Sequence, residues 1–314
     1  FWLKTCWFKT KLNIRHSCCD FGTMPIDFPT KYCEVEELRD GHLLVVKLNR
    51  PKGLNSLHNR CHMELARVWD YFDSNDELWV GVLTGNGRAF CAGNDLRVNA
   101  GVDTDGDGET LKPYNGQEVR EPPSGFGGVA NRKSAKPIIA AVNGVAHGGG
   151  FELALSCDII VASEKADFAL PEVRVGLAAL AGGLLKLPRL IGYQNAMEMI
   201  LTARRVNGAD AYKMGIAQRL VPADQSVLDE AIKVADEILL GSPDGVQLSV
   251  QVSKALYYES LDIFKMMKDQ TKYPTFRRLF RGPNVVEGPK AFTQKRKPKW
   301  VPPEPLAKFE KSKL

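Results

Sequence analysis

The sequence predicts an α/β fold built on parallel strands. Short runs rich in β-branched residues and closed by Gly, Asn or Ser predict buried strands at residues 42–48, 78–85, 137–144 and 158–164. Between the first two runs, apolar residues recur at helical spacing over residues 57–73. A strand, a helix and a second strand in this order are typical of parallel pairing, because the helix carries the chain back to the edge where the next strand begins.

The composition is that of a globular protein with a sizeable core. The chain has 314 residues, of which 44% are hydrophobic and 25% are charged. That length suits one large domain or about two average domains. No run approaches the roughly 18 apolar residues that a membrane-spanning helix needs, so we expect no membrane span. The chain beyond residue 190 is predicted to be mainly helical.

The net charge of +5 is concentrated at the two ends of the sequence. Residues 1–23 carry a net charge of +3 and residues 295–314 a net charge of +5, which leaves −3 for residues 24–294. A negatively charged central part argues against binding of nucleic acid.

Both terminal segments resemble targeting signals, so we do not use them to predict the fold. Residues 1–23 are basic, and they are interpreted either as an organellar presequence or as an upstream segment ahead of Met24; both interpretations stay open. Residues 301–314 predict a flexible tail, and its last three residues, Ser-Lys-Leu, match the address that the peroxisomal import receptor reads. We therefore expect a peroxisomal location, with the mitochondrion as the alternative if residues 1–23 are a presequence.

Three further features do not predict a metal site. Residues 98–130 are rich in Gly, Pro and Asp and predict a long mobile surface loop. Its run from Asp103 resembles the front of a calcium-binding loop, but Tyr114 stands where a bidentate Glu is required. His58 and His62 are four residues apart without an acidic partner, and the seven cysteines form no CxxC pair.

The stretch AHGGGFELALSCD, residues 146–158, places three glycines ahead of an apolar run that contains Glu152. The glycines are explained equally well by a tight turn from a strand into a helix, or by a helix start that a ligand approaches closely. On the second interpretation the backbone N–H of Gly149 faces developing negative charge. Glu152 is explained in part by the helix dipole, which favours a carboxylate in the first turn, but not by its apolar neighbours.

Two further segments complete the candidate site. Glu172 lies in FALPEVRVG, again among apolar residues. Two carboxylates that share one site have their pKa values driven apart, which allows one to act as an acid and the other as a base. GRAFCAGNDLR, residues 87–97, follows a predicted strand, and there Gly93 would make a sharp turn and Asn94 would offer a backbone N–H.

Taken together, these motifs resemble the enoyl-CoA hydratase/isomerase, or crotonase, family over residues 35–300. The resemblance is carried by LNRPKGLNSL, GRAFCAGNDLR, the run from KPIIAAVNG to PEVRVG, and EGPKAFTQKRKPKW, in that order. It implies a crotonase-like spiral of ββα units over residues 24–222 and a C-terminal helical trimerisation region over residues 223–300. It also implies homotrimers or homohexamers that bind acyl-CoA thioesters and need no other cofactor, since coenzyme A is part of the substrate.

The resemblance also implies roles for individual residues. The N–H groups of Asn94 and Gly149 would form an oxyanion hole for the thioester oxygen, Glu152 would deprotonate a water that attacks C3, and Glu172 would protonate C2. Hydratases of the family have Glu at both positions, whereas simple isomerases usually keep only the second. The resemblance therefore predicts addition of water to a 2-enoyl-CoA, or the reverse dehydration. The residues implied in binding the CoA part are Lys52, Ala92, Asp95, Leu96, Arg97, Phe292 and Lys295.

One departure from the family pattern concerns the acyl group. Leu180 stands where typical hydratases have a glycine that lines the acyl pocket. The run GGGFELAL followed by FALPE is also similar to the carnitinyl-CoA dehydratase branch, which handles a short and polar acyl group. The alternatives left open are another crotonase reaction, such as isomerisation or thioester hydrolysis, and a non-catalytic member that binds CoA esters, protein or RNA.

Overall fold

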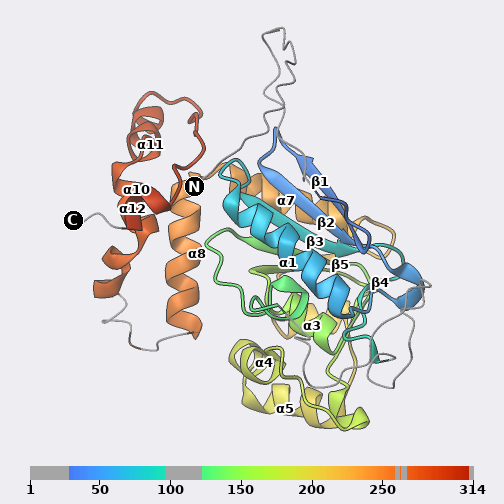
Figure 1. The fold of residues 1–314 in the computed structure, drawn as a ribbon. Coiled ribbons are helices and arrows are strands. Elements are labelled where there is room, and N and C mark those ends of the chain that lie inside the picture. The colour runs from blue at the N-terminus through green and yellow to red at the C-terminus, as the bar shows by residue number, and fades with distance from the viewer. Residues whose placement is uncertain (1–27, 97–121, 259–261, 263–266, 311–314) are drawn as a thin grey trace, which may run out of the picture.

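The fold consists of two parallel-rich sheets and a set of helices (Figure 1). The computed structural model describes residues 28–96, 122–258, 262 and 267–310. Within them the first sheet has the order β1-β2-β3-β5-β7-β10 and the second has the order β4-β6-β8-β9. The strands of the first sheet are β1 (Cys33–Leu38), β2 (Leu43–Leu48), β3 (Val80–Gly85), β5 (Ile138–Val142), β7 (Ile159–Ser163) and β10 (Arg219–Val221). Those of the second are β4 (Ala89–Cys91), β6 (Val145–His147), β8 (Asp167–Ala169) and β9 (Val206–Asn207).

The first sheet lies between α1 (Asn59–Ser74) on one face and α7 (Val227–Leu239) on the other (Figure 1). Successive strand residues point to opposite faces, so alternate apolar residues join two separate cores. The face toward α1 includes Leu44, Val46, Leu83, Ala140 and Ala162. The face toward α7 includes Leu43, Val45, Val82, Ile139 and Val161. This two-sided burial explains why the strands appear as continuous apolar runs in the sequence.

The α/β class and the parallel pairing predicted from the sequence are confirmed. β2 pairs with β3, β3 with β5, and β5 with β7, all in parallel, and each predicted run contains one of these strands. The sequence did not reveal β1, which pairs with β2 in antiparallel fashion. Its residues, CEVEEL, include three glutamates, because β1 forms the edge of the sheet and is only partly buried.

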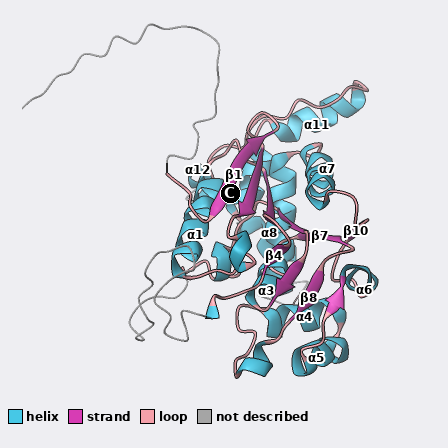
Figure 2. Cartoon of the chain, turned by 90° about the vertical axis from the view of Figure 1, so that its right-hand side faces the viewer, coloured by secondary structure: helices cyan, strands magenta, loops and turns pink. Residues whose placement is uncertain are grey.

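The chain passes repeatedly from a strand of the first sheet to a strand of the second, and this repetition forms a spiral. β3 leads into β4, β5 into β6, and β7 into β8, so parallel neighbours in the first sheet are followed by parallel neighbours in the second. After β6 the chain enters α3 (Gly149–Ala154) directly. The second sheet lies close to α3 and α4 (Gly183–Ile191), as Figure 2 shows. The crotonase-like spiral of ββα units is thereby confirmed.

The remaining helices surround the site and form the C-terminal part. They are α5 (Tyr193–Thr202), α6 (Gly208–Lys213), α8 (Pro243–Tyr258), α10 (Pro274–Arg281), α11 (Asn284–Thr293) and α12 (Ala307–Glu310), with 3₁₀ turns η1 (Pro51–Gly53), η2 (Phe126–Gly128), η3 (Glu172–Val175) and η4 (Gln270–Lys272). α8, α10, α11 and α12 stand beside the sheets (Figure 1). A buried ion pair fixes this part, since Arg278 Nε lies 2.7 Å from Asp244 Oδ1.

One prediction was wrong in part. Residues 97–121 of the predicted surface loop lie outside the described residues, but residues 125–130 are buried. Phe126 is 2% exposed, and Gly127 and Gly128 have φ values of +61° and +72°. A methyl group on Gly128 would lie 2.7 Å from Ala66 Cα, so glycine lets this segment pack directly on α1. In residues 125–130 the glycines therefore reflect close packing.

Two other predictions fall outside the described residues: the segment 1–23 and the Ser-Lys-Leu end both stay predictions. Among the residues that are described, no helix is long and apolar enough to cross a membrane.

Candidate active site

The glycine run forms a tight turn that starts α3. Gly148 has φ +53° and ψ −128°, and its N–H donates to Ala169 O at 2.9 Å. A methyl group on Gly149 would lie 2.5 Å from the Phe126 ring, and one on Gly150 would lie 1.9 Å from Cys91 O. Packing within the protein therefore requires glycine at both positions, which favours the tight-turn interpretation of these residues.

The two predicted oxyanion donors belong to neighbouring segments. Gly93 has φ +95°, and a methyl group there would lie 3.1 Å from Gly149 N, so the loop after β4 runs against the start of α3. Asn94 follows directly. Within the described residues neither the N–H of Asn94 nor that of Gly149 donates a hydrogen bond. Both amides are thus available to a ligand, and that of Gly149 stands at the positive end of the helix.

Glu152 is a buried carboxylate held by a second helix start. Its side chain is 3% exposed, and its Oε1 accepts a hydrogen bond from Gly183 N at 2.8 Å. Gly183 is the first residue of α4, and a methyl group on it would lie 3.1 Å from Glu152 Oε1. The hydrogen bond and the dipole of α4 both favour the ionised carboxylate.

Glu172 has a different environment. It opens η3, and its Oε1 lies 3.0 Å from the position that a methyl group on Gly148 would occupy. Its Oε2 is buried and has no hydrogen-bond partner among the described residues. Burial raises the pKa of Glu172 above its ordinary value. A carboxyl group whose protonated form is favoured in this way suits proton donation.

The two glutamates border the same turn. Glu172 lies against Gly148, and Glu152 N donates to Gly148 O at 3.0 Å from one turn further along α3. His147, just before the turn, is fixed by Asp167 of β8, whose Oδ2 lies 2.9 Å from His147 Nε2. The groups that the resemblance implies for catalysis, the amides of Asn94 and Gly149 and the carboxyl groups of Glu152 and Glu172, thus belong to segments that meet around the glycine turn. Such a set can stabilise an oxyanion and move protons on and off a nearby carbon.

The structure also places most of the residues implied in CoA binding. Ala92 N donates to Leu54 O at 2.9 Å, which brings the loop after β4 against η1, where Lys52 is exposed. Leu96 is exposed on the same loop. The Asp95 carboxylate is turned inward, with its Oδ2 3.2 Å from Nη1 of the buried Arg50. That buried ion pair holds the loop after β4 in place, so the Asp95 side chain stabilises the loop from the interior of the protein.

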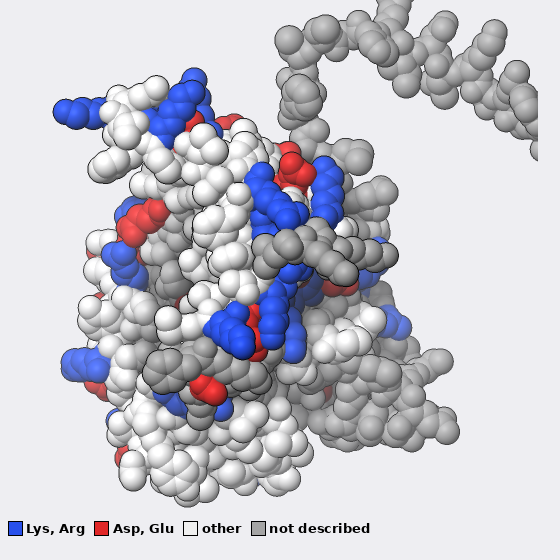
Figure 3. Space-filling model, turned by 90° about the vertical axis from the view of Figure 1, so that its left-hand side faces the viewer, with Lys and Arg blue, Asp and Glu red and all other residues white. Residues whose placement is uncertain are grey.

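Among the other predicted binding residues, Phe292 and Lys295 do not join the glutamates within one chain. Leu180 is 81% exposed, and Arg97 lies outside the described residues. Phe292 and Lys295 lie at the end of α11, at the opposite end of the molecule from α3 and α4 in both views (Figures 1 and 2). Phe292 is 84% exposed, so it has little packing within its own chain. On this side of the molecule Lys and Arg side chains gather in patches, with acidic side chains beside them (Figure 3).

The histidine pair has separate partners in the core. His62 Nδ1 accepts a hydrogen bond from Gly127 N at 3.1 Å, and burial lowers the pKa of His62 to about 3. His58 packs edge-on against Tyr32, with ring centroids 4.8 Å apart. Both rings therefore serve packing around α1.

Sequence reasoning missed Gly183 and Arg50, which hold Glu152 and the loop after β4. Gly182 and Gly183 form a second glycine pair ahead of an apolar run, and this was the available signal for another helix start beside the site. No local pattern indicates Arg50, because its partner Asp95 is 45 residues away.

Comparison with known proteins gives consistent matches over most of the chain. A family model described as enoyl-CoA hydratase/isomerase matches residues 39–303. The chain is 40% identical over 261 residues to the mevalonyl-coenzyme A hydratase SIDH of Beauveria bassiana, covering 82% of this chain and 91% of that protein. It is 36% identical over 264 residues to the carnitinyl-CoA dehydratase of Proteus mirabilis, covering 83% and 95%.

Solved structures agree with these matches. The crystal structure of an enoyl-CoA hydratase from Mycobacterium tuberculosis H37Rv superposes with a TM-score of 0.72 at 33% identity, covering 86% of this chain and 98% of that one. The motifs, the spiral fold and the geometry around the glycine turn lead to the same conclusion: the chain belongs to the enoyl-CoA hydratase/isomerase, or crotonase, family.

Proposed function

We propose that this enzyme adds water across the double bond of a 2-enoyl-CoA to give a 3-hydroxyacyl-CoA, or catalyses the reverse dehydration. The N–H groups of Asn94 and Gly149 hold the thioester oxygen as negative charge develops on it. Glu152 takes a proton from the attacking water, whose oxygen bonds to C3. Glu172 gives its proton to C2, which returns the enolate to a thioester carbonyl. We also propose that no cofactor is needed beyond the coenzyme A of the substrate.

The observation that carries this proposal is the contrast between the two glutamates. Glu152 accepts a hydrogen bond from the start of α4, which favours its ionised form, and Glu172 has an unpartnered buried oxygen that favours its protonated form. Hydration needs one base and one acid at the same moment, and this pair supplies both. Isomerisation needs only one carboxyl group that moves a proton between two carbons, so it does not account for Glu152.

A direct assay tests the reaction. The purified chain is mixed with 2-enoyl-CoA thioesters, and the loss of the absorbance of the conjugated thioester is followed together with the mass of the product. We expect a product heavier by one water molecule. A product of unchanged mass would indicate isomerisation and free coenzyme A would indicate hydrolysis, and either result would contradict the proposal.

We further propose that the acyl group is short and carries a polar substituent. This rests on the relatives named mevalonyl-coenzyme A hydratase and carnitinyl-CoA dehydratase, and on the resemblance, by which Leu180 replaces a glycine that lines the acyl pocket of typical hydratases. In the same assay, kcat/KM for short hydroxylated or charged acyl groups should exceed that for an unsubstituted eight-carbon chain.

We also propose that the enzyme works as a homotrimer or homohexamer, in which α11 of one copy brings Phe292 and Lys295 to the CoA site of another. The distance of α11 from α3 within one chain supports this arrangement. A second support is an apolar face on η3, α4 and α5, since exposed faces of this kind commonly mark interfaces. Its exposed side chains are Val173, Val175, Leu177, Leu185, Tyr193 and Leu201.

Light scattering on the purified protein tests the assembly. The chain mass is 34.7 kDa, and we expect a particle of three or six times that mass. Leu185→Glu, at a position that is 73% exposed in one chain, should shift the particle toward the single chain because it buries a charge in the interface. The control Lys213→Glu changes an exposed charge on α6, which contributes none of the side chains of the apolar face, and should leave the mass unaltered. A wild-type particle of single-chain mass would contradict the proposal.

A further inference from the structure

Lys186 lies close to Glu152 and contacts the end of α3 opposite to the glycine turn. It belongs to the first turn of α4, the helix whose first amide donates to the Glu152 carboxylate. Its Nζ donates to Ser156 Oγ at 2.7 Å and to Ala130 O at 2.9 Å. Ser156 Oγ in turn donates to Glu152 O at 2.6 Å. Lys186 therefore connects α4 to the end of α3 and to the segment that follows η2.

The Lys186 side chain forms no ion pair at hydrogen-bonding distance within the described residues. Its hydrogen-bond acceptors are a carbonyl and a hydroxyl group, and no carboxylate bonds to it among the described residues. Burial lowers the pKa of Lys186 to about 8, while the nearby Cys157, Glu152 and Asp158 act in the opposite direction and favour the charged form. This influence is mutual, because a cation that is stabilised by a carboxylate stabilises the ionised carboxylate to the same extent.

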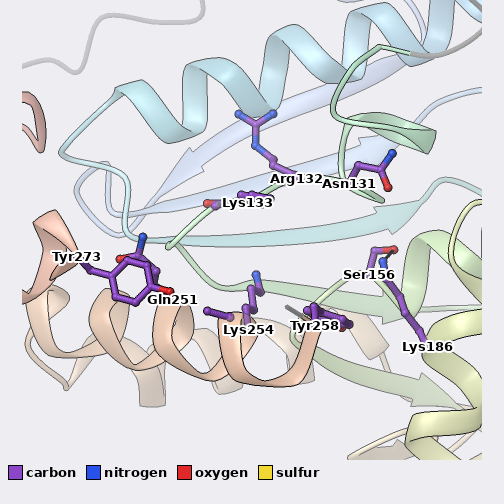
Figure 4. Close-up of a pocket in the computed structure, with 11 residues that line it drawn as sticks. Asn131, Arg132, Lys133, Ser156, Lys186, Gln251, Lys254, Tyr258 and Tyr273 are labelled. Atoms are coloured by element: carbon purple, nitrogen blue, oxygen red, sulfur yellow. Dashed lines mark hydrogen bonds between the residues drawn. The ribbon is translucent and has the colours of Figure 1, made fainter. Parts of the chain in front are cut away.

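Figure 4 shows Lys186 and Ser156 at one end of a cavity of about 620 Å³ between α8 and the core. The charged and titratable groups that face Lys186 are Glu152 and Cys157 on and after α3, Asp158 before β7, and Lys254 and Tyr258 on α8. Lys254 is paired with Asp158, with Nζ 2.9 Å from Oδ1. Lys186 is thus the cation in this group that has no hydrogen-bonded carboxylate among the described residues, and Glu152 is one of the groups that favour its charge.

We propose that Lys186 is a positioning residue for the Glu152 carboxylate. It ties the first turn of α4 to the end of α3, so that Gly183 N stays against Glu152, and its charge favours the ionised form that removes a proton from water. The inference rests on the proposed hydratase function, because only that reaction requires Glu152 as a base. It assigns the cation a role in setting the pH range of the enzyme rather than in touching the substrate.

The test compares Lys186→Met, Lys186→Arg and the control Arg189→Met in the full chain. Arg189 lies one turn further along α4 and donates to Tyr257 O on α8. In Lys186→Met the acidic limb of the pH profile of kcat/KM should move up by about one pH unit, because the ionised carboxylate loses a nearby positive charge. We expect kcat at neutral pH to fall about tenfold, with KM changing much less. In Lys186→Arg the acidic limb should return to its wild-type position, and in Arg189→Met it should not move.

A second measurement does not depend on turnover. The infrared band of a protonated carboxyl group, taken as the difference between the chain and its Glu152→Gln variant, gives the midpoint of ionisation of residue 152. That midpoint should be higher in the Lys186→Met background by a similar amount. If Lys186→Met does not fold, Ser156→Ala is used, since it removes one of the two acceptors and should shift the midpoint in the same direction. Unchanged midpoints would overturn the inference even if kcat falls, whereas absence of hydration by the wild-type chain would overturn only the proposed function.

Discussion

Glu152→Gln is expected to lower kcat for hydration by about 10³-fold while KM for the acyl-CoA stays within a few-fold of the wild-type value. Gln has the size and shape of Glu, and its carbonyl oxygen can still accept the hydrogen bond from Gly183 N. The fold is therefore retained, and the change removes only the base that deprotonates water. Steady-state kinetics with the best enoyl-CoA of the substrate panel measure the effect.

The control for this variant is Glu198→Gln, which changes an exposed carboxylate on α5 that pairs with Arg204. It should have wild-type kinetics. Hydration by Glu152→Gln at more than a tenth of the wild-type rate would remove Glu152 from the mechanism and leave the catalytic role of the site to Glu172 alone.

Glu172→Gln is expected to lower kcat by about 10² to 10³-fold, for a different reason. This side chain exchanges a proton with C2, so its loss should also abolish exchange of the C2 hydrogens of a bound acyl-CoA with solvent deuterium. Glu152→Gln should retain that exchange, because the enolate still forms next to Glu172. Mass spectrometry of the acyl-CoA after incubation in D₂O distinguishes the two variants.

The same residue predicts how the rate depends on pH. Burial raises the pKa of Glu172, and hydration needs its protonated form. The rate of hydration should therefore decline as the pH rises through that pKa, which gives the pH profile of kcat/KM an alkaline limb. Because the addition of water releases no proton, kcat/KM for dehydration should follow the same profile, with Glu172 ionised and Glu152 protonated. In Glu172→Gln the residual activity should lack this alkaline limb, and a limb that persists in the variant would contradict the assignment of Glu172 as the group that exchanges the C2 proton.

The strands that hold the site could be predicted because their sequence signal is local. β3, β5 and β7 are buried on both faces by α1 and α7, so each appears as an apolar run of β-branched residues. Edge strand β1 lacks that signal because only Cys33 of its six residues is fully buried. Residues 125–130 were assigned to a surface loop because glycine marks both mobile loops and close packing, and composition does not distinguish the two.

The site itself was predictable only in part for a related reason. A carboxylate among apolar residues after three glycines is visible in the sequence, and this identified Glu152. Gly183, which donates to its carboxylate, and Lys186, which we propose as its positioning residue, lie about 30 residues further on, and their approach follows from the packing of α4 on α3. Long-range contacts of this kind have no periodic signature, and neither does the inward ion pair between Asp95 and Arg50.

The structure of the enzyme with an unreactive acyl-CoA thioester bound would test most directly whether two amides and two glutamates act on one enolate. We expect the thioester oxygen at about 2.7–3.1 Å from the backbone nitrogens of Asn94 and Gly149, the usual range for such a site. The carboxyl groups of residues 152 and 172 should then lie on the same side of the acyl chain, beside C3 and C2 respectively. A thioester oxygen bound elsewhere, or either carboxyl group facing away from these carbons, would contradict the mechanism.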